Sequence, residues 1–170
     1  LNWLLDQIDA KTGIRIRSDN IVARERLRHA AELAKRALTD KLSYVFELDT
    51  LQLGLGGPTE TEIECTREQL DRCARSVIDQ ASAICRRAVE QIARLTWNDI
   101  DHVILVGGQT LMPAVQDSVA ALTGKQPLIL PKPQEAVALG AGVYAHIISL
   151  GEREIRQQLL TNVVALPVGI

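Results

Sequence analysis

Hydrophobic residues recur at helical spacing in two stretches near the start of the chain. The apolar positions are Trp3, Leu4 and Ile8 in the first stretch and Leu27, Ala31, Ala34 and Leu38 in the second. Residues three or four apart lie on the same face of a helix, so each set forms one apolar stripe. Lys11, Thr12 and Gly13 end the first stretch, whereas the second is longer and rich in arginine. The pattern predicts a helix over residues 1–10 and a longer amphipathic helix over about 19–38.

Two strand-like runs follow, at residues 42–48 and 60–65, on either side of the glycine-rich stretch 54–58. Such runs bounded by glycine and proline predict a small antiparallel sheet. Segment 66–69 then begins with threonine and ends with glutamine, which is the spacing of a capping box at a helix start. Helical periodicity continues from there to about residue 95, so this helix is expected to be the longest element.

Residues 103–106, Val-Ile-Leu-Val, form an uninterrupted apolar run of the type found in strands that are covered on both faces. We therefore expect this strand to lie centrally in a sheet. It stops at Gly107-Gly108, and a helix is predicted from Pro113, because proline is well tolerated in a first helical turn. Gly124 ends that helix, and a short strand is expected over 127–130.

A final helix is predicted over residues 134–149, after the proline-rich segment 131–133. Its small residues would let another backbone approach closely, and they are Gly140, Ala141, Gly142 and Ala145. The last twenty residues change from charged to apolar, and they are interpreted as a linker followed by the start of a strand.

Composition and charge indicate a globular domain and argue against a nucleic-acid-binding or membrane-spanning protein. A chain of 170 residues with 46% hydrophobic and 24% charged residues corresponds to one domain or to two small subdomains that share a boundary. The formal net charge of -2 provides no basic excess for nucleic acid. The longest nearly apolar stretch, 136–150, is shorter than the roughly 20 residues that a membrane-spanning helix needs. We therefore expect no nucleic-acid partner and no membrane span.

The cysteines are odd in number and lack the paired two-residue spacing of a zinc or redox site: Cys65, Cys73 and Cys85. Reduced and mostly buried thiols are expected. The three histidines have no cysteine or carboxylate cluster at metal-ligand spacing, so neither a metal site nor a catalytic residue is assigned. No leader segment opens the chain, which starts at Leu1, and an excised part of a cytoplasmic protein is expected.

Two patterns have the residue types of a binding site. Gly107 and Gly108 would let backbone amides approach a phosphate, although such turns are also common as plain structural turns. The second pattern is a helical stripe of Glu32, Lys35, Arg36 and Thr39. The stripe could grip a ribose and base, or it could be a solvated face with an ion pair between Glu32 and Arg36. Asp99 and Asp101 are interpreted as capping and surface groups.

Three separated segments resemble the DnaK-type chaperones, the seventy-kilodalton heat-shock family, in the same order and at matching spacing. Segment 26–38 is similar to the family's adenosine-contacting helix. Segment 103–113 resembles its valine-glycine-glycine-serine-threonine-arginine-isoleucine-proline loop, and 133–141, Pro-Gln-Glu-Ala-Val-Ala-Leu-Gly-Ala, is the third match. Residues 66–70 also fit the start of the family's connecting helix. The resemblance covers essentially the whole chain.

The resemblance implies an α/β fold, the second lobe of an actin-like (ribonuclease H-like) ATPase with a small α+β peripheral subdomain. Residues 1–78 would be the peripheral subdomain and 79–154 the actin-like base. Residues 155–164 would be an interdomain linker, and 165–170 only the first strand of a peptide-binding domain. In the family the catalytic lysine, the acidic residues and both main phosphate loops lie upstream of this region.

Carried over residue by residue, the resemblance implies that Glu32, Lys35, Arg36 and Thr39 contact ribose and base, and that Gly107 and Gly108 pass under the phosphate and ribose. The chain departs from the family at Leu111, where an adenine-stacking arginine is usual, and at Gln109 and Gln134, which replace a serine and an aspartate. The linker departs too, with polar residues at Gln157, Gln158, Thr161 and Asn162. The chain is therefore identified as a divergent member.

Two functions follow as alternatives. In the first, the chain supplies the adenosine side of an ATP or ADP site, with magnesium in the intact parent, and alone does not hydrolyse ATP. The parent would work with a nucleotide exchange factor, a J-domain co-chaperone and an unfolded client. In the second, Leu111 and Gln134 mark a docking module that no longer depends on nucleotide. Another actin-like ATPase, such as a sugar kinase or a filament protein, is a weaker alternative, because Lys35-Arg36 and residues 135–138 match the chaperones.

Overall fold

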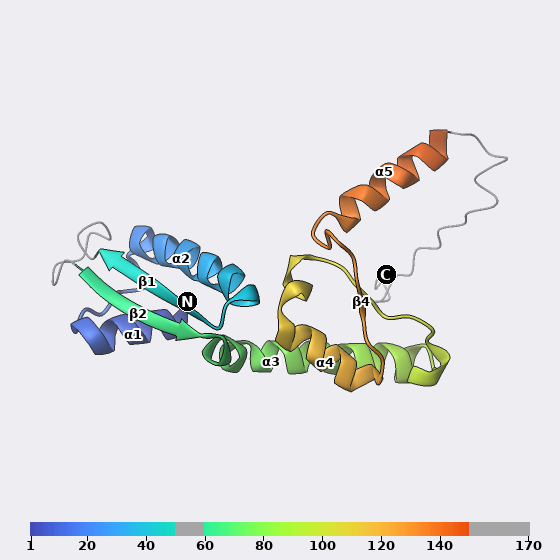
Figure 1. The fold of residues 1–170 in the computed structure, drawn as a ribbon, viewed down its shortest axis with the longest axis horizontal. Coiled ribbons are helices and arrows are strands. Elements are labelled where there is room, and N and C mark those ends of the chain that lie inside the picture. The colour runs from blue at the N-terminus through green and yellow to red at the C-terminus, as the bar shows by residue number, and fades with distance from the viewer. Residues whose placement is uncertain (50–59, 150–170) are drawn as a thin grey trace, which may run out of the picture.

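One long helix, α3, runs between two groups of elements in this computed structural model, which describes residues 1–49 and 60–149 (Figure 1). The first group contains α1 (Asn2–Thr12), α2 (Ile21–Asp40), β1 (Ser43–Asp49) and β2 (Glu60–Thr66). Helix α3 (Arg67–Arg86) continues into the π-helical η1 (Arg87–Ile92) and the short η2 (Trp97–Asp99). The second group contains β3 (Ile104–Leu105), η3 (Gly108–Leu111), α4 (Pro113–Thr123), β4 (Leu128–Ile129) and α5 (Ala136–Ser149).

The core of the first group forms where the two predicted amphipathic helices meet the hairpin. Helix α1 contributes Leu4 and Ile8, and α2 contributes Leu27 and Leu38, all 1% exposed. Ile63 of β2 packs in the same cluster. These are the apolar positions that the helical spacing selects, so the prediction of both helices is confirmed.

Helix α1 ends where the sequence indicates. Gly13 adopts a left-handed conformation with φ of 69°, which costs glycine little and most other residues more. At the start of α2 the Asn20 side chain accepts a hydrogen bond from the Ala23 amide at 3.1 Å. The helix therefore begins within two residues of the predicted position.

Strands β1 and β2 form the predicted antiparallel hairpin, with Phe46 opposite Ile63. Side chains alternate between the two faces of a strand, and here one face is buried against the helices. The other face is exposed and places Glu47 directly opposite Glu62. Like charges in opposed positions are unfavourable, so burial of the inner face stabilises the hairpin. The predicted glycine-rich turn at 54–58 lies outside the described residues.

Helix α3 begins with the predicted capping box. The Gln69 amide donates to Thr66 Oγ1 at 3.3 Å, and the Thr66 amide donates to Gln69 Oε1 at 2.7 Å. The helix keeps α-helical geometry to Arg86 and then widens into the six-residue π-helix η1. The sequence thus predicts the start of α3 to the residue, but not its change of geometry.

Helix α4 packs against α3, and the hydroxyl oxygens of Ser82 and Ser118 are 3.0 Å apart across this contact. Pro113 lies in its first turn and Gly124 follows its last residue, both as predicted. This packing attaches the second group of elements to α3 (Figure 1).

The prediction of a central strand at 103–106 is wrong for the residues that the structure describes. β3 is only two residues long, and its one neighbour among the described strands is β4, which pairs with it in parallel. Ile104 is 56% exposed and Val106 is 50% exposed. A continuous apolar run favours burial on both faces only where other layers cover the strand, and the described elements supply no such cover.

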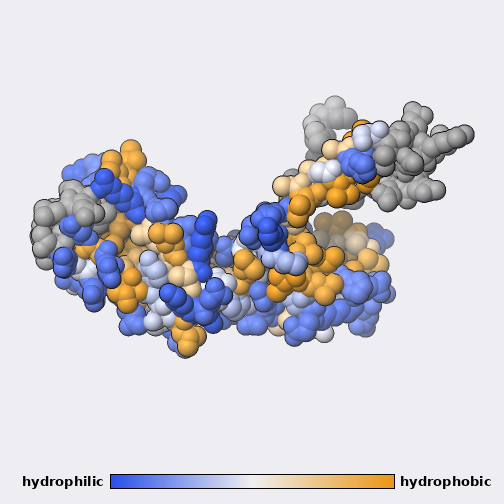
Figure 2. Space-filling model, turned by 45° about the horizontal axis from the view of Figure 1, so that its top comes forward, coloured by the Kyte–Doolittle hydropathy of each residue, from blue (hydrophilic) through white to orange (hydrophobic). Residues whose placement is uncertain are grey.

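The small residues of α5 would permit another backbone to approach closely, but no part of the described chain does so. A Cβ placed on Gly140 or Gly142 would meet no atom of the described residues within 4 Å. Hydrophobic side chains are accordingly exposed on this helix, as Figure 2 shows for the half of the molecule that contains α4 and α5: Val137, Leu139, Val143, Tyr144 and Ile148. None of the described helices is long and apolar enough to cross a membrane.

The cysteines differ in part from expectation. All three are free, as predicted. Only Cys65 is buried, whereas Cys73 and Cys85 are exposed, so the expectation of mostly buried thiols is wrong. Burial raises the pKa of the Cys65 thiol above its ordinary value. The predicted linker and final strand start, at 155–170, lie outside the described residues. The proposed boundary after residue 78 stays a prediction, and α3 crosses it without a break.

Replacing Leu27 with alanine should lower the free energy of unfolding by about 2–5 kcal/mol, because a buried leucine loses its contacts and leaves a cavity. Leu33 lies on the same helix but is 45% exposed, so Leu33→Ala should change stability by no more than about 0.5 kcal/mol. Urea denaturation followed by far-ultraviolet circular dichroism measures both. Equal effects of the two substitutions would contradict the core described above.

Candidate functional site

A cavity of about 420 Å³ lies between α2 and the turn that contains η3. The C-terminal half of α2 forms one wall, and η3 with the residue before α4 forms the other. The described lining residues are Glu32, Lys35, Arg36, Thr39, Asp40, Gly108, Gln109, Leu111, Met112 and Gln134. The two patterns that the sequence singles out separately, the helical stripe and the glycine turn, therefore face one cavity.

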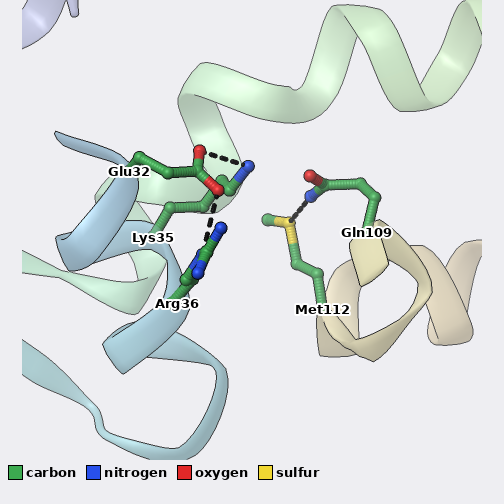
Figure 3. Close-up of polar contacts among 5 residues, drawn as sticks. All are labelled: Glu32, Lys35, Arg36, Gln109 and Met112. Carbon is green, nitrogen blue, oxygen red and sulfur yellow. Dashed lines mark hydrogen bonds and ion pairs between the residues drawn. The ribbon is translucent and has the colours of Figure 1, made fainter. Parts of the chain in front are cut away.

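The α2 wall is organised by one carboxylate. Glu32 contacts the Lys35 ammonium at 2.7 Å and the Arg36 Nε at 3.2 Å (Figure 3). Residues three and four positions apart are neighbours on a helix surface, which explains why one side chain can reach both cations. The ion pair expected from the sequence is present, and both residues line the cavity while the side chains of Glu32 and Arg36 stay 42% and 74% exposed.

This arrangement shifts the titration of Glu32. The hydrogen bond with Lys35 has the largest effect and lowers the pKa of Glu32 below its ordinary value. Burial, the next largest effect, raises the pKa, and the interactions with Arg36 lower it further, so the net shift is downward. Glu32 is therefore ionised over the physiological pH range. Its negative charge offsets part of the positive charge that Lys35 and Arg36 bring to the cavity.

The opposite wall starts at Gly107, whose φ of 94° lies in a region that side chains rarely adopt. Its amide donates to the Pro133 carbonyl at 2.7 Å, and the Thr110 hydroxyl donates to the Gly107 carbonyl at 2.6 Å. These bonds hold the turn in place and bring the segment around Pro133 against it. Gly107 thus shapes the turn, while its neighbour Gly108 lines the cavity.

The side chains of this wall give it a mixed surface. Leu111 is 38% exposed into its surroundings, whereas Met112 is only 4% exposed. The Gln109 amide nitrogen lies 3.4 Å from the Met112 sulfur, and both side chains lie across from Lys35 and Arg36 in Figure 3. A cavity with two cations and a carboxylate on one side and apolar carbons on the other suits a ligand with a flat apolar part and polar hydroxyls.

Seven of the eight predicted site residues line the cavity, and the eighth, Gly107, directly precedes the lining residue Gly108. Three lining residues are not among the predicted ones, namely Asp40, Gln109 and Met112. Asp40 and Met112 directly follow the predicted Thr39 and Leu111, so extending each predicted segment by one residue would have found them. Gln109 drew notice only as a departure from the family pattern.

Asp99, interpreted from the sequence together with Asp101 as a capping or surface group, has the predicted capping role. Its Oδ2 accepts hydrogen bonds from the Thr96 amide at 2.8 Å and the Thr96 hydroxyl at 2.7 Å. These bonds lower the pKa of Asp99. Asp99 and Thr96 together cap the short helix η2.

The sequence model of the family described as Hsp70 protein matches residues 1–170. The chain belongs to the Hsp70 family. An Hsp70 protein has an actin-like ATPase fold, binds ATP and ADP with magnesium, and works with co-chaperones and client proteins. The mixed α/β structure with small sheets is consistent with that fold.

The cavity residues of this Hsp70 protein fit part of a nucleotide. Glu32 can accept hydrogen bonds from ribose hydroxyls, Lys35 and Arg36 can donate, and Leu111 offers an apolar surface to a base. Metal ligands are a different matter, because residues 1–49 and 60–149 contain no group of three histidine, cysteine, aspartate or glutamate side chains that could hold an ion. We therefore assign no magnesium ligand to the described part of the chain.

Glu32→Gln should reduce stability only where Glu32 is ionised in the folded protein. A carboxyl group with a lowered pKa stabilises the fold above its unfolded pKa, here ordinarily 4.5, and this contribution is lost as the pH falls through the folded value. The side chain is 42% exposed, so the two ion pairs together should contribute no more than about 1 kcal/mol.

Chemical denaturation between pH 7 and pH 3 tests this expectation. The difference between the wild type and Glu32→Gln should be constant down to about pH 4.5 and then shrink. A double-mutant cycle with Lys35→Gln serves as the control, because it isolates the interaction free energy between Glu32 and Lys35. A difference that grows toward acid pH would show that the described ion pair does not stabilise the protein.

Proposed function

We propose that this chain forms the adenosine side of the ATP-binding cleft of a DnaK-type chaperone. The observation that carries the proposal is the single cavity into which the α2 stripe and the Gly108 turn both project. Family membership supports nucleotide as the ligand class. Neither pattern alone distinguishes a ligand site from ordinary helix and turn structure, but their convergence on one cavity favours a ligand.

Each residue in this proposal has a role that follows from its chemistry. Glu32 accepts from the ribose hydroxyls, while Lys35 and Arg36 donate to ribose or base and attract the anionic ligand. Thr39 adds a hydroxyl at the end of α2. Gly108 has no side chain, so its backbone can come close to the phosphate end of the nucleotide.

The opposite wall predicts weak binding. Leu111 can cover one face of a base but offers neither the flat cation nor the donors of an arginine. Gln134 provides a neutral amide, which can still donate and accept hydrogen bonds. Lys35 and Arg36 are also already paired with Glu32, so a nucleotide must compete with that ion pair.

We further propose that residues 1–78 form the peripheral subdomain of the second lobe and 79–154 its base, with α3 connecting them. In this arrangement the exposed face of the hairpin and of α3 would receive a nucleotide exchange factor. The intact parent would act in the cytoplasm with a J-domain co-chaperone, and unfolded clients would bind to a separate domain.

The second candidate is a docking module that no longer depends on nucleotide. The features that favour it are Leu111, Gln134 and the partial offset of the Lys35 and Arg36 charges by Glu32, each of which weakens a nucleotide contact. The two candidates differ in one measurable property, the affinity of the cavity for adenosine and ADP.

Lys35→Gln should weaken ADP binding about 10-fold, the equivalent of one lost hydrogen bond to a charged group. Leu111→Arg should strengthen it by about 2- to 5-fold, because a guanidinium can stack on the base. Lys41→Gln is the matched control, since Lys41 has the same charge and lies just after α2 but is not among the described lining residues. Calorimetric or NMR titration measures all three.

If Lys35→Gln and Lys41→Gln change the affinity equally, the cavity is not the ADP site. If the wild type shows no binding even at millimolar ADP and Leu111→Arg does not restore it, the docking module becomes the better account.

ATP turnover by the purified chain should be absent, because the resemblance to the family implies that the catalytic lysine, the acidic residues and both main phosphate loops lie upstream of this region. A coupled phosphate-release assay measures this turnover, and Lys35→Gln protein purified in the same way serves as the control for contaminating ATPases. Turnover that is present in the wild type and lost in Lys35→Gln would contradict the proposed lack of hydrolysis, whereas equal turnover in both identifies a contaminating ATPase.

A further inference from the structure

The C-terminal end of α2 is held by one side chain of α3, that of Arg67. Its Nε donates to the Leu38 carbonyl at 2.8 Å and its Nη2 donates to the Thr39 carbonyl at 3.0 Å. The Arg67 amide also donates to the Leu42 carbonyl at 2.8 Å. Three carbonyl groups at or just after the end of α2 therefore bond to the first residue of α3.

These bonds meet a specific need of α2. The last four carbonyls of a helix have no partner within the helix. The last turn of α2 contains no basic residue, and the cap residue Lys41 has an extended conformation instead of the left-handed one that would satisfy these carbonyls locally. Arg67 supplies both the missing donors and a positive charge at the negative end of the helix dipole.

The held turn belongs to the cavity. Thr39 and Asp40 line it, and Lys35 and Arg36 lie one turn earlier on the same helix. Arg67 itself is not among the described lining residues. Its guanidinium therefore makes no direct contact in the cavity wall, and its bonds act on the position of the α2 backbone.

Helix α3 reaches the opposite wall as well. Ser82 of α3 contacts Ser118 of α4, and α4 begins directly after Met112. The Gln116 side chain of α4 donates to the Thr110 carbonyl at 2.9 Å, which ties the η3 turn to the helix. The same rigid helix thus contacts the elements that form both walls of the cavity.

We infer that Arg67 is a positioning residue for the cavity: its bonds to Leu38 and Thr39 set the distance between the α2 wall and the wall formed by Leu111 and Met112. The consequence for nucleotide rests on the function proposed above. A guanidinium can bond two carbonyls at once, whereas a lysine ammonium at the end of a flexible chain holds them less firmly.

Met112 provides a direct reporter of this distance. It is the single methionine of the chain, it lines the cavity, and its side chain lies across from Lys35 and Arg36 (Figure 3). Protein labelled with ¹³C at the methionine methyl group gives one NMR signal, from the Met112 wall. The position of this signal reports the packing of the cavity without any ligand.

The experiment compares Arg67→Gln and Arg67→Lys with the wild type. Without ligand, Arg67→Gln should shift or broaden the Met112 signal, and Arg67→Lys should do so to a smaller extent. Following the same signal in a titration, Arg67→Gln should weaken adenosine and ADP binding by the same factor, about 10-fold if the displaced α2 wall loses one hydrogen bond to the ligand. Equal factors are expected because that wall lies on the adenosine side.

Lys11→Gln is the matched control. Lys11 also donates from a cationic side chain to a carbonyl of the same group of elements, that of Glu62 at 2.8 Å, but it does not line the cavity. It should leave the Met112 signal in place and the affinities within about 2-fold of the wild type, even if it lowers the melting temperature as much as Arg67→Gln.

An unchanged Met112 signal in Arg67→Gln overturns the inference. So does a shifted signal with unchanged affinities, because Arg67 would then support the fold without setting the site. If neither adenosine nor ADP moves the wild-type signal, the proposed nucleotide function is wrong, and the ligand-free spectra of the Arg67 variants alone decide whether Arg67 positions the walls.

Discussion

The joint between α2 and α3 is the constraint on which the rest of the structure depends. Helix α3 contacts both the hairpin group, through α2 and β2, and α4. Its first residue bonds to the end of α2, and its capping box fixes the direction in which the helix leaves β2. Because a 20-residue helix spans about 30 Å, a small change of angle at this joint would move the η3 turn by several ångströms relative to α2. The cavity is therefore a product of long-range geometry as much as of its own side chains.

Local signals account for the parts of the fold that could be predicted. The stripe of Leu27 and Leu38 and the capping box at Thr66 and Gln69 each act within a few residues, so their patterns are readable in the sequence. The features that the sequence does not determine are of another kind. Burial of Ile104 and close packing of Gly140 depend on which other elements cover them, and no pattern inside a segment determines its cover.

Local patterns also predict some features of the candidate site, whereas others depend on contacts between distant segments. The sequence places Glu32, Lys35 and Arg36 on one face of a helix, but it leaves open whether that face meets solvent or a ligand. The resemblance to a chaperone family favoured the ligand, and the structure places these residues in a cavity with Leu111 and Gln134. The bonds of Arg67 to Leu38 and Thr39 could not be found this way, because an arginine at the start of a helix is common and its partners lie far away in the sequence.

The opposed glutamates on the hairpin and the exposed apolar residues on β3 and β4 have opposite effects on association with other chains. Both strands of the hairpin are edge strands in the described sheet, and the charges of Glu47 and Glu62 on them discourage a foreign strand from pairing there. Ile104 and Leu128 instead present apolar side chains beside short unprotected strands, a surface that attracts other chains. The hairpin therefore disfavours aggregation, whereas the β3 and β4 strands favour it. The second group of elements, which contains β3 and β4, thus determines how the chain behaves in concentrated solution.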